Sequence, residues 1–518
     1  MTGDAMKSIG KLVLLTVLNA GAGFAQIGAP PVPQPSAQIL PASGRNNQGG
    51  SVNAAEQPVP GTTTSVNTLN TTVQISGPYS GSARSTTAMP FNGKLSLEDA
   101  LKRALSYNLG GIGTAESARQ TGAQARGARS TLLPNISLAL SETVEQVDLA
   151  ALGVRFTVPP GLTGFRLPTV NGPFNYINLQ GNFTQNIADL TAINNYRSAR
   201  ATARASQYTM EDARDLITLA VGGAYLQVLA AQARLDAAQV QLDTANAVFH
   251  QSSEQHTEGV LGKLNVDQNQ VRTLTQQQQL TTLRNDLAKQ KINLARLTGL
   301  PPNPNYELTD KFPYSPAPVN TVEEAIARAE RERSDLKAAE AQVDAASRAL
   351  AAARAERLPS LSLSGDYQVI GTNPDHSHGA FSVAGTLNIP VWLGGRTGSD
   401  IAQAQAVLAQ RRAELEDVRG QVEAEVREVY LDLEAAAGQV EVARKNVDVA
   451  NETLEMTRAR MQAGVVNTLE VVQAQETVSS AQLDLINSIF AHNLAKLNLA
   501  RALGHAGEQL PDLLKPEK

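Results

Sequence analysis

The stretch Ile177-Asn-Leu-Gln-Gly-Asn-Phe-Thr-Gln-Asn-Ile187 alternates apolar and polar side chains. A period of two indicates a β-strand, because successive side chains in a strand point to opposite faces. Three further stretches, at about 134–147, 360–370 and 380–390, alternate in the same way. Together with 175–187 they predict four strands. Their polar face is expected to carry Asn178, Gln180, Asn182, Thr184, Ser362, Ser364, Asp366, Ser382 and Thr386.

Such strands suit any half-buried sheet, but length and one polar face are also typical of strands in an outer-membrane barrel. Four strands cannot close a barrel, because the smallest known barrels need about eight. An open sheet edge is not tolerated in lipid. If these strands span a membrane, the chain must therefore self-associate.

Two long segments flank the strands, at about 188–256 and 399–461, and neither contains a proline. Both repeat apolar residues every seven positions, which indicates long helices with left-handed coiling. The first helix would be on the order of 100 Å long, which is unusual for a globular bundle. In the first segment one column is Val221, Val228, Leu235, Leu242 and Phe249, beside Ile217, Ala224, Ala231, Ala238 and Ala245. In the second the columns are Val426, Leu433, Val440, Val447 and Leu454, beside Val422, Val429, Ala436, Ala443 and Ala450.

The sequence is internally duplicated. Residues 97–104 recur at 322–329 and residues 133–138 recur at 358–363, both with an offset of 225. Beyond the first strand pair the offset falls to about 205, which localises an insertion to 145–175 in the first half. Each half is expected to be helix, strand, strand, very long helix, turn, helix. The predicted division is repeat 1 at 93–300, a proline-rich linker at 301–320, repeat 2 at 321–505 and a tail at 506–518.

The N-terminus has the three parts of a secretory signal peptide. Lys7 and Lys11 precede a short apolar run, and small residues follow up to Ala25. The run is too short to span a bilayer, so residues 1–25 are predicted to be a cleaved signal. Residues 26–92 are rich in Pro, Gly, Ser, Thr, Asn and Gln and nearly uncharged, which predicts a disordered segment.

The composition excludes several classes of function. The chain has no cysteine, so it has no disulfide, thiol nucleophile or acceptor for a lipid anchor. A net charge of -5 gives no basic field for nucleic acid. No P-loop, Gly-x-Ser-x-Gly or His-Glu-x-x-His motif is present, so neither an enzyme nor a cofactor is expected. Asp375 to His378 lie in a predicted exposed loop, and His250 and His256 do not have zinc-pair spacing, so no metal site is expected.

Over residues 95–505 the pattern resembles the TolC-like outer membrane efflux proteins. The duplication with its order of elements carries the resemblance, together with two short stretches. Asn388-Ile-Pro-Val-Trp-Leu-Gly-Gly-Arg396 is similar to the family's strand-to-helix corner. Arg460-Met-Gln-Ala-Gly-Val-Val-Asn-Thr-Leu-Glu-Val-Val-Gln-Ala-Gln475 is similar to its tip turn.

The resemblance implies a mainly α-helical fold with a membrane β-barrel. Three copies would give a homotrimer with one 12-stranded barrel in outer-membrane lipid, continued by an α-helical tunnel across the periplasm. Loops 145–175 and 371–379 would be extracellular. The chain would be the unlipidated exit duct of a tripartite efflux or type I secretion system.

The same resemblance implies the partners and the site residues. A periplasmic adaptor, and through it an inner-membrane pump, would meet the tip turns at Gly259, Val260, Leu261, Gly464, Val465 and Val466. Each glycine also suits a turn that needs a positive φ. The pore entrance would be formed by Glu470, Asn265, Gln473, Val466 and Met461. Only Glu470 among these is acidic, so the entrance would be less polar than in the family's best-known member.

Two other classes of protein share some of these features. A periplasmic adaptor also carries long helical hairpins, but it has one hairpin and soluble β-domains rather than a duplicated unit. A non-conducting coiled-coil protein of the envelope would leave the polar strand faces without a role. The exit duct is therefore the leading prediction.

Overall fold

The computed structural model describes residues 51–59, 68–83, 90–149, 151, 169–311, 314–316, 321–463, 465–466, 468–504 and 506–507. The predicted signal peptide, Gly464 and most of the C-terminal tail lie outside these residues.

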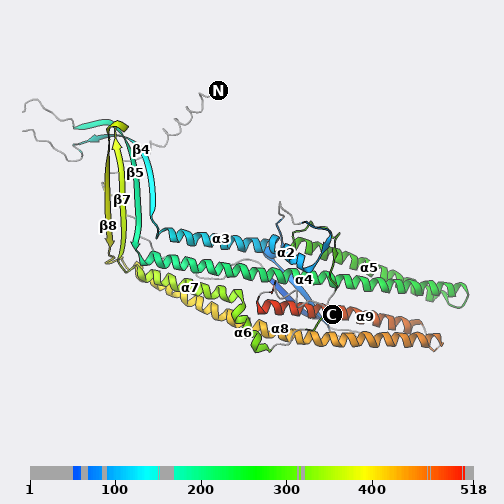
Figure 1. The fold of residues 1–518 in the computed structure, drawn as a ribbon. Helices are drawn as coiled ribbons and strands as arrows, with labels where there is room; N and C mark the ends of the chain where they lie inside the picture. The colour runs from blue at the N-terminus through cyan, green and yellow to red at the C-terminus, as the bar shows by residue number, and fades with distance from the viewer. Residues whose placement is uncertain are drawn as a thin grey trace, which may run out of the picture. The chain divides into compact units, whose positions relative to one another are not determined.

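Both repeats have the expected order of elements (Figure 1). Repeat 1 comprises α2 (Leu97–Tyr107), α3 (Leu109–Ser130), β4 (Asn135–Asp148), β5 (Val170–Ala188), α4 (Leu190–Thr257) and α5 (Lys263–Leu297). Repeat 2 comprises α6 (Val322–Glu332), α7 (Ser334–Ala355), β7 (Ser360–Gly371), the 3-10 turn η2 (Pro374–His376), β8 (Ser377–Asn388), α8 (Arg396–Gln462) and α9 (Thr468–Leu503). The short strands β3 (Lys94–Leu95) and β6 (Glu307–Leu308) pair in parallel.

The heptad columns form the interior of the helical part. Ile217, Val221 and Val228 of α4 are completely buried, as are Val422, Val426 and Val440 of α8. Each such side chain contributes about 1.5–3 kcal/mol of transfer free energy. Alanines of the partner columns, such as Ala238 and Ala436, are also buried and let neighbouring helices approach closely. Helix α4 packs against α3, α5, α7 and α9, and α8 packs against α7 and α9.

One helix in the described part of the chain, α4, contains an 18-residue stretch apolar enough to cross a membrane. Within the protein 78% of that stretch is buried, which is the pattern of a core helix. Helix α4 begins where the Asp189 side chain accepts a hydrogen bond from the Ala192 amide. It ends just before Gly259, whose φ of +77° is a value that glycine adopts without steric cost.

The four predicted strands form one antiparallel sheet in the order β4-β5-β7-β8 (Figure 1). The connection from β5 to β7 passes through α4, α5, α6 and α7, so the sheet joins the two repeats. Its register aligns Ile136, Phe183, Gly365 and Val383 in one row across all four strands.

The prediction of disorder for 26–92 is wrong for part of that segment. Strands β1 (Val52–Val59) and β2 (Thr68–Ile75) form an antiparallel hairpin, followed by the 3-10 turn η1 (Gly77–Ser80). Val52 and Tyr79 are buried, and Val73 and Ile75 pack against the core that contains α4. These apolar residues are too sparse to give a periodic pattern. The segment orders because the existing helices supply the apolar surface that it could not build alone.

Candidate functional site

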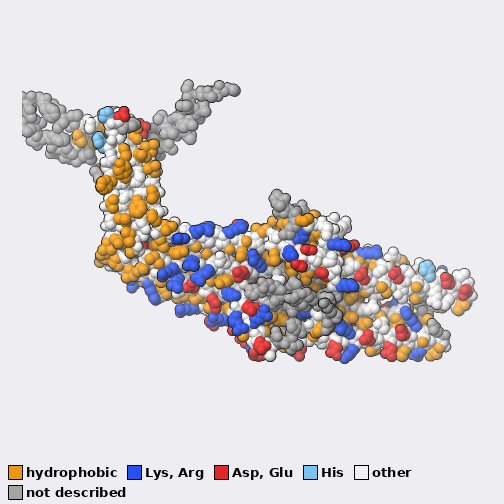
Figure 2. Space-filling model, viewed as in Figure 1, with side chains coloured by type: hydrophobic (Ala, Val, Ile, Leu, Met, Phe, Trp, Pro, Cys, Tyr) orange, Lys and Arg blue, Asp and Glu red, His pale blue; other side chains and the backbone are white. Residues whose placement is uncertain are grey.

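One face of the sheet is apolar and unusually exposed. Ile136, Leu138 and Leu140 of β4 are 73–79% exposed, and Phe381 and Val383 of β8 are 77% and 70% exposed. Figure 2 shows hydrophobic side chains over the length of the sheet. A contiguous apolar surface of this kind marks an interaction with a membrane or another protein.

The opposite face is polar, and the register brings the predicted polar residues together on it. Asn182 lies opposite Asp366, which lies opposite Ser382. The Ser382 hydroxyl donates a hydrogen bond to the Asp366 carboxylate, and the Gln180 amide donates to the Asn182 side chain over 3.0 Å. The alternation places the rest on the same face: Asn178, Thr184, Ser362, Ser364 and Thr386. That this face lines a lumen remains a proposal.

Both edges of the sheet are open within the described chain. Strand β4 pairs only with β5, and β8 pairs only with β7. Each edge therefore offers a row of backbone N–H and C=O groups to another strand. In hydrocarbon these groups must be paired, which leaves closure with further copies as the available solution.

The two helical turns at the far ends of α4 and α8 expose matching apolar residues. Val260 and Leu264 are 74% and 70% exposed, and their equivalents Val465 and Leu469 are 65% and 60% exposed. The Gly259 amide donates to the His256 carbonyl over 2.9 Å, which closes the first turn. Leu261 and Val466 are half-buried at the same turns.

The predicted entrance residues lie close to these turns but differ in exposure. Glu470 is exposed in the first turn of α9, where a helix N-terminus favours a carboxylate, and Gln473 is exposed one turn later. Asn265 is half-buried at the start of α5. Met461 packs against the apolar cluster of Leu454, Val471 and Ala474, so it has a packing role in the single chain.

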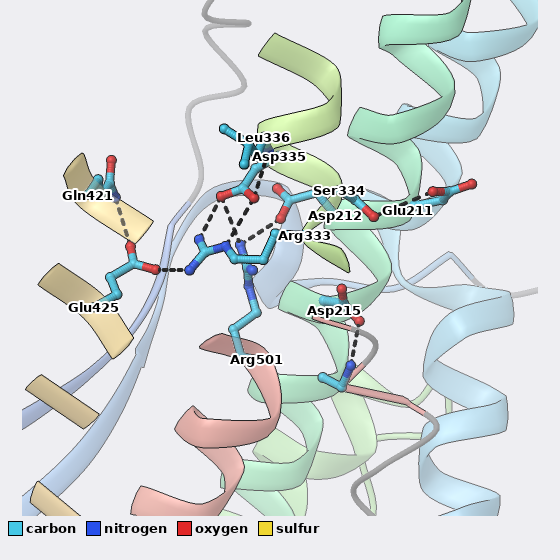
Figure 3. Close-up of polar contacts among 11 residues, drawn as sticks. Glu211, Asp212, Asp215, Arg333, Ser334, Asp335, Leu336, Gln421, Glu425 and Arg501 are labelled. Carbon is cyan, nitrogen blue, oxygen red and sulfur yellow. Dashed lines mark hydrogen bonds and ion pairs between the residues drawn. The ribbon is translucent and has the colours of Figure 1, made fainter. Parts of the chain in front are cut away.

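A buried ionic network was missed by the sequence reasoning (Figure 3). The Arg333 side chain is 1% exposed, and its guanidinium donates to both carboxylate oxygens of Asp335 over 3.0 and 2.6 Å and to Glu425 over 2.5 Å. Arg501 pairs with Asp212 over 2.6 Å and lies 4.0 Å from Asp335. The network thus ties α4, α7, α8 and α9 together at one level.

The electrostatics of this network follow from its burial. Burial raises the pKa of Asp212 to about 6 although Arg501 opposes the rise. Burial also acts to raise the pKa of Asp335, but its hydrogen bonds and charge interaction with Arg333 hold that pKa below its ordinary value. The signal that could have located the network is the repeat offset of 225, which places Arg333 at the same helix break as Asn108.

Among the described residues no group of three or more His, Asp or Glu side chains is placed to hold a metal ion. In the loop after β7, His376 instead interacts through Nδ1 with the Asn373 side chain at 2.9 Å. The absence of a cofactor remains a prediction.

The sequence matches the outer membrane efflux protein family over residues 114–300 and 325–505. The chain belongs to the outer membrane efflux protein family. The two matched segments fall within the two repeats, and membership places the protein in the outer membrane, as predicted.

Relatives of this efflux protein include the pyoverdine export outer membrane protein OpmQ of Pseudomonas aeruginosa, at 27% identity over 60% of this chain and 65% of OpmQ. The chain thus spans about two thirds of the length of OpmQ. TolC of Vibrio cholerae is 23% identical over 63% of this chain and 76% of that protein. TolC of Escherichia coli is 24% identical over 75% and 77%, respectively.

Solved outer-membrane proteins share the fold of this efflux protein. VceC of Vibrio cholerae superposes with a TM-score of 0.63 at 20% identity, covering 79% of this chain and 96% of VceC. The Campylobacter jejuni channel CmeC superposes with a TM-score of 0.66 at 16% identity, covering 81% and 89%. The predicted fold class and the resemblance to TolC-like proteins are confirmed.

Proposed function

We propose that three copies of this chain form a passive exit duct for a tripartite efflux or type I secretion system. The observation that carries the proposal is the four-stranded sheet with two unlike faces and two open edges. Three such sheets joined edge to edge would give 12 strands, enough for a closed barrel. Its apolar face would meet lipid and its polar face would line the lumen.

The tip turns are proposed to receive a periplasmic adaptor. Val260 and Leu264 in one repeat, and Val465 and Leu469 in the other, present the same exposed apolar pair. Apolar anchors on two neighbouring turns suit the helical hairpin of a partner. An adaptor would in turn couple the duct to an inner-membrane pump, because the sequence contains no P-loop and the family consists of outer membrane proteins.

Glu470 is proposed to form an acidic ring at the entrance. Three exposed carboxylates around the axis would attract cations and resist anions. Asn265 and Gln473, the neighbouring polar positions, are neutral and would not add to the ring.

Conductance in planar lipid bilayers tests the duct. The purified protein is expected to run as a heat-modifiable trimer and to conduct, and Glu470→Gln is expected to lower its preference for cations. The neighbouring Gln473→Ala is the control that leaves the charge of the ring unchanged. A trimer that conducts in no state, with tip variants included, would contradict the proposal.

Photo-crosslinking in cells tests the adaptor contact. A photoreactive residue at Val465 is expected to capture a periplasmic protein, whereas one at Val391, beside the sheet, is not. Solubility of the full chain without detergent would instead favour an adaptor-like role for this protein.

A further inference from the structure

The ends of the helices nearest the sheet carry arginines without partners. Six exposed arginines make no side-chain hydrogen bond or ion pair with the described chain: Arg126, Arg129, Arg197, Arg200, Arg354 and Arg357. We refer to these six as the arginine collar. Figure 2 shows Lys and Arg side chains gathered on the helices next to the apolar sheet, with acidic side chains more frequent toward the tips.

The exposed charge around the collar is predominantly positive. In repeat 2 the nearby carboxylates Glu356 and Asp400 are only 4% and 22% exposed, and both lie within 4.0 Å of Arg396. Helix α3 contains one acidic residue, Glu116, and that carboxylate already pairs with Arg119. The first 21 residues of α4, 190–210, contain no acidic residue and no lysine. An ordinary solvated surface mixes both signs. Arginine is also the residue that binds phosphate with a planar, bidentate guanidinium, unlike lysine.

The collar recurs in both repeats at one level of the fold. Arg129 and Arg354 are equivalent at the offset of 225, each in or beside the last turn of its helix and six residues before a strand begins. Between β8 and α8, Val391 and Trp392 are 92% and 84% exposed. An exposed tryptophan at this junction marks the membrane–water interface. The collar residues nearest the strands therefore lie within reach of headgroup charge, which extends about 8 Å into physiological salt.

Farther along the strands from this junction, the apolar face contains a groove of about 480 Å³. Its sides include Ile136, Phe183, Tyr367 and Phe381. Gly181 of β5 and Gly365 of β7 have no side chain, and this leaves room for the groove between the larger residues. Ile136 is the second residue of β4, whereas Gly365 and Val383 lie midway along β7 and β8, so the groove runs from the collar end of β4 toward the middle of the sheet. A hydrocarbon chain suits an apolar groove that is continuous with a lipid-facing surface.

We propose that the collar and the groove together bind an anionic glycerophospholipid of the periplasmic leaflet. The phosphate would lie on the guanidinium groups, and an acyl chain would lie in the glycine-based groove. The inference rests on the membrane position proposed above. The lipid site is tested by lipid binding and the exit duct by conductance, so either proposal can fail without the other.

Native mass spectrometry of the detergent-solubilised full chain tests the proposal. Phosphatidylglycerol is expected to remain bound in preference to phosphatidylethanolamine. Arg129→Gln with Arg354→Gln is expected to weaken phosphatidylglycerol binding about 30-fold, at about 1 kcal/mol for each of the two arginines near the membrane surface. The matched control, Arg412→Gln with Arg458→Gln, removes two exposed arginines far from the strands and is expected to leave binding unchanged.

The groove has its own pair of variants. A side chain at Gly181 meets only ordinary contacts, the nearest being Tyr367 O at 3.8 Å, so Gly181→Leu is expected to fold and to displace the acyl chain. Gly385→Leu, on the same face with nothing within 4 Å of its Cβ, is the control. If the arginine variant fails to assemble, the wild-type protein in high salt must lose its preference for phosphatidylglycerol.

Three results would overturn the proposal. One is equal binding of the two lipids by the wild-type protein. Another is displacement of phosphatidylglycerol by inorganic phosphate alone, which would mean a simple anion site. The third is binding of isolated peptidoglycan by the collar with no lipid preference, which would assign the arginines to the cell wall.

Discussion

The two repeats break their first helix at the same place, but with a neutral side chain in one repeat and a charged side chain in the other. Asn108 separates α2 from α3 with φ and ψ of -64° and 132°, and Arg333 separates α6 from α7 with -63° and 129°. At the first break the Asn108 side chain accepts from the Gly110 amide over 2.9 Å and donates to the Tyr79 carbonyl over 2.8 Å. At the second break a buried arginine holds carboxylates from two helices. Duplication has retained the backbone geometry here, while the side chains that stabilise it have diverged.

Removing Arg333 is expected to have the largest effect on stability. Arg333→Ala removes the cation that Glu425 pairs with and leaves Asp335 only the more distant Arg501 at 4.0 Å, and both carboxylates are only partly exposed. We expect a loss of about 2–4 kcal/mol in the free energy of unfolding. This is less than for a completely buried ion pair, because solvent reaches the two carboxylates. Urea denaturation at fixed protein concentration, followed by circular dichroism, measures it.

The neutral break provides the matched comparison. Asn108→Ala removes a helix cap and a buried hydrogen bond, for an expected loss of about 1–2 kcal/mol. An Asn108→Ala loss equal to that of Arg333→Ala would mean that the two breaks are equally dependent on their side chains.

The close approach at Gly110 is the next difference to test. A Cβ at Gly110 would clash with the Tyr79 ring, whereas the equivalent position in repeat 2 already carries Asp335. Gly110→Ala is therefore expected to displace the N-terminal segment and to cost about 1–3 kcal/mol. Gly113→Ala, in the same helix with open space around it, is expected to gain about 0.5–1 kcal/mol by helix propensity. Protease sensitivity of the segment around Tyr79, measured beside denaturation, separates displacement from general destabilisation.

Sequence reasoning succeeded where many residues repeat one simple pattern. The heptad columns around Val221 and Val426 predicted α4 and α8 within about three residues, because burial of one helix face requires that period. The alternation around Phe183 likewise predicted β5. It failed where order depends on single contacts between distant segments. Neither Tyr79 over Gly110 nor Arg333 beside Asp335 has a local pattern. Comparing the repeats aligns Arg333 with Asn108, but Tyr79 lies outside both repeats.

A third difference lies at the ends of the last helices. Lys291 of α5 and Lys496 of α9 are equivalent, and both donate a hydrogen bond to the segment between the repeats. Lys291 donates to the Tyr306 carbonyl over 2.9 Å, and Lys496 donates to the Ser315 hydroxyl over 2.7 Å. One turn earlier repeat 1 has the buried Leu287, while repeat 2 has His492. His492 is fully buried, and neither ring nitrogen has a hydrogen-bond partner among the described residues.

His492→Leu is expected to stabilise the protein by about 1 kcal/mol at pH 7.5, because it removes an unpaired polar group. Burial, and then the charge of Lys496, lowers the pKa of His492 to about 4. The other described groups near His492 are Tyr314 and Arg444, whose guanidinium lies over the Tyr314 ring. Neither group carries a negative charge. The unfolded histidine binds a proton at about pH 6.5, so wild-type stability falls as the pH drops from 6.5 toward 4.

The advantage of His492→Leu should therefore grow by about 1–2 kcal/mol between pH 7.5 and pH 5. Denaturation at the two pH values measures the change. His250→Leu, on the exposed side of α4, should show no such growth. A constant difference between His492→Leu and the wild type would exclude this histidine as a source of acid sensitivity.

The smallest expected effect concerns the helix pairs that carry the tips. Where the α8–α9 pair buries Ala474 and Ala481, the α4–α5 pair has Asn269 and Gln276 at the equivalent positions. The Gln276 side-chain oxygen is buried and has no hydrogen-bond partner in the described part of the chain. The first pair should therefore open more readily near its tip, since unsatisfied polar groups weaken a packed interface.

Gln276→Ala introduces the residue that repeat 2 uses and is expected to gain about 0.5 kcal/mol, because a buried unpaired oxygen is removed and alanine favours helix. Hydrogen exchange of the α5 amides in 263–280 should slow, whereas α9 amides in 468–485 should not change. Gln277→Ala, at an exposed neighbouring position, provides the helix-propensity contribution alone. If the α5 amides exchange faster in Gln276→Ala than in Gln277→Ala, then Gln276 stabilises the α4–α5 pair in the trimer. The α4–α5 and α8–α9 pairs would then open about equally readily, contrary to the prediction.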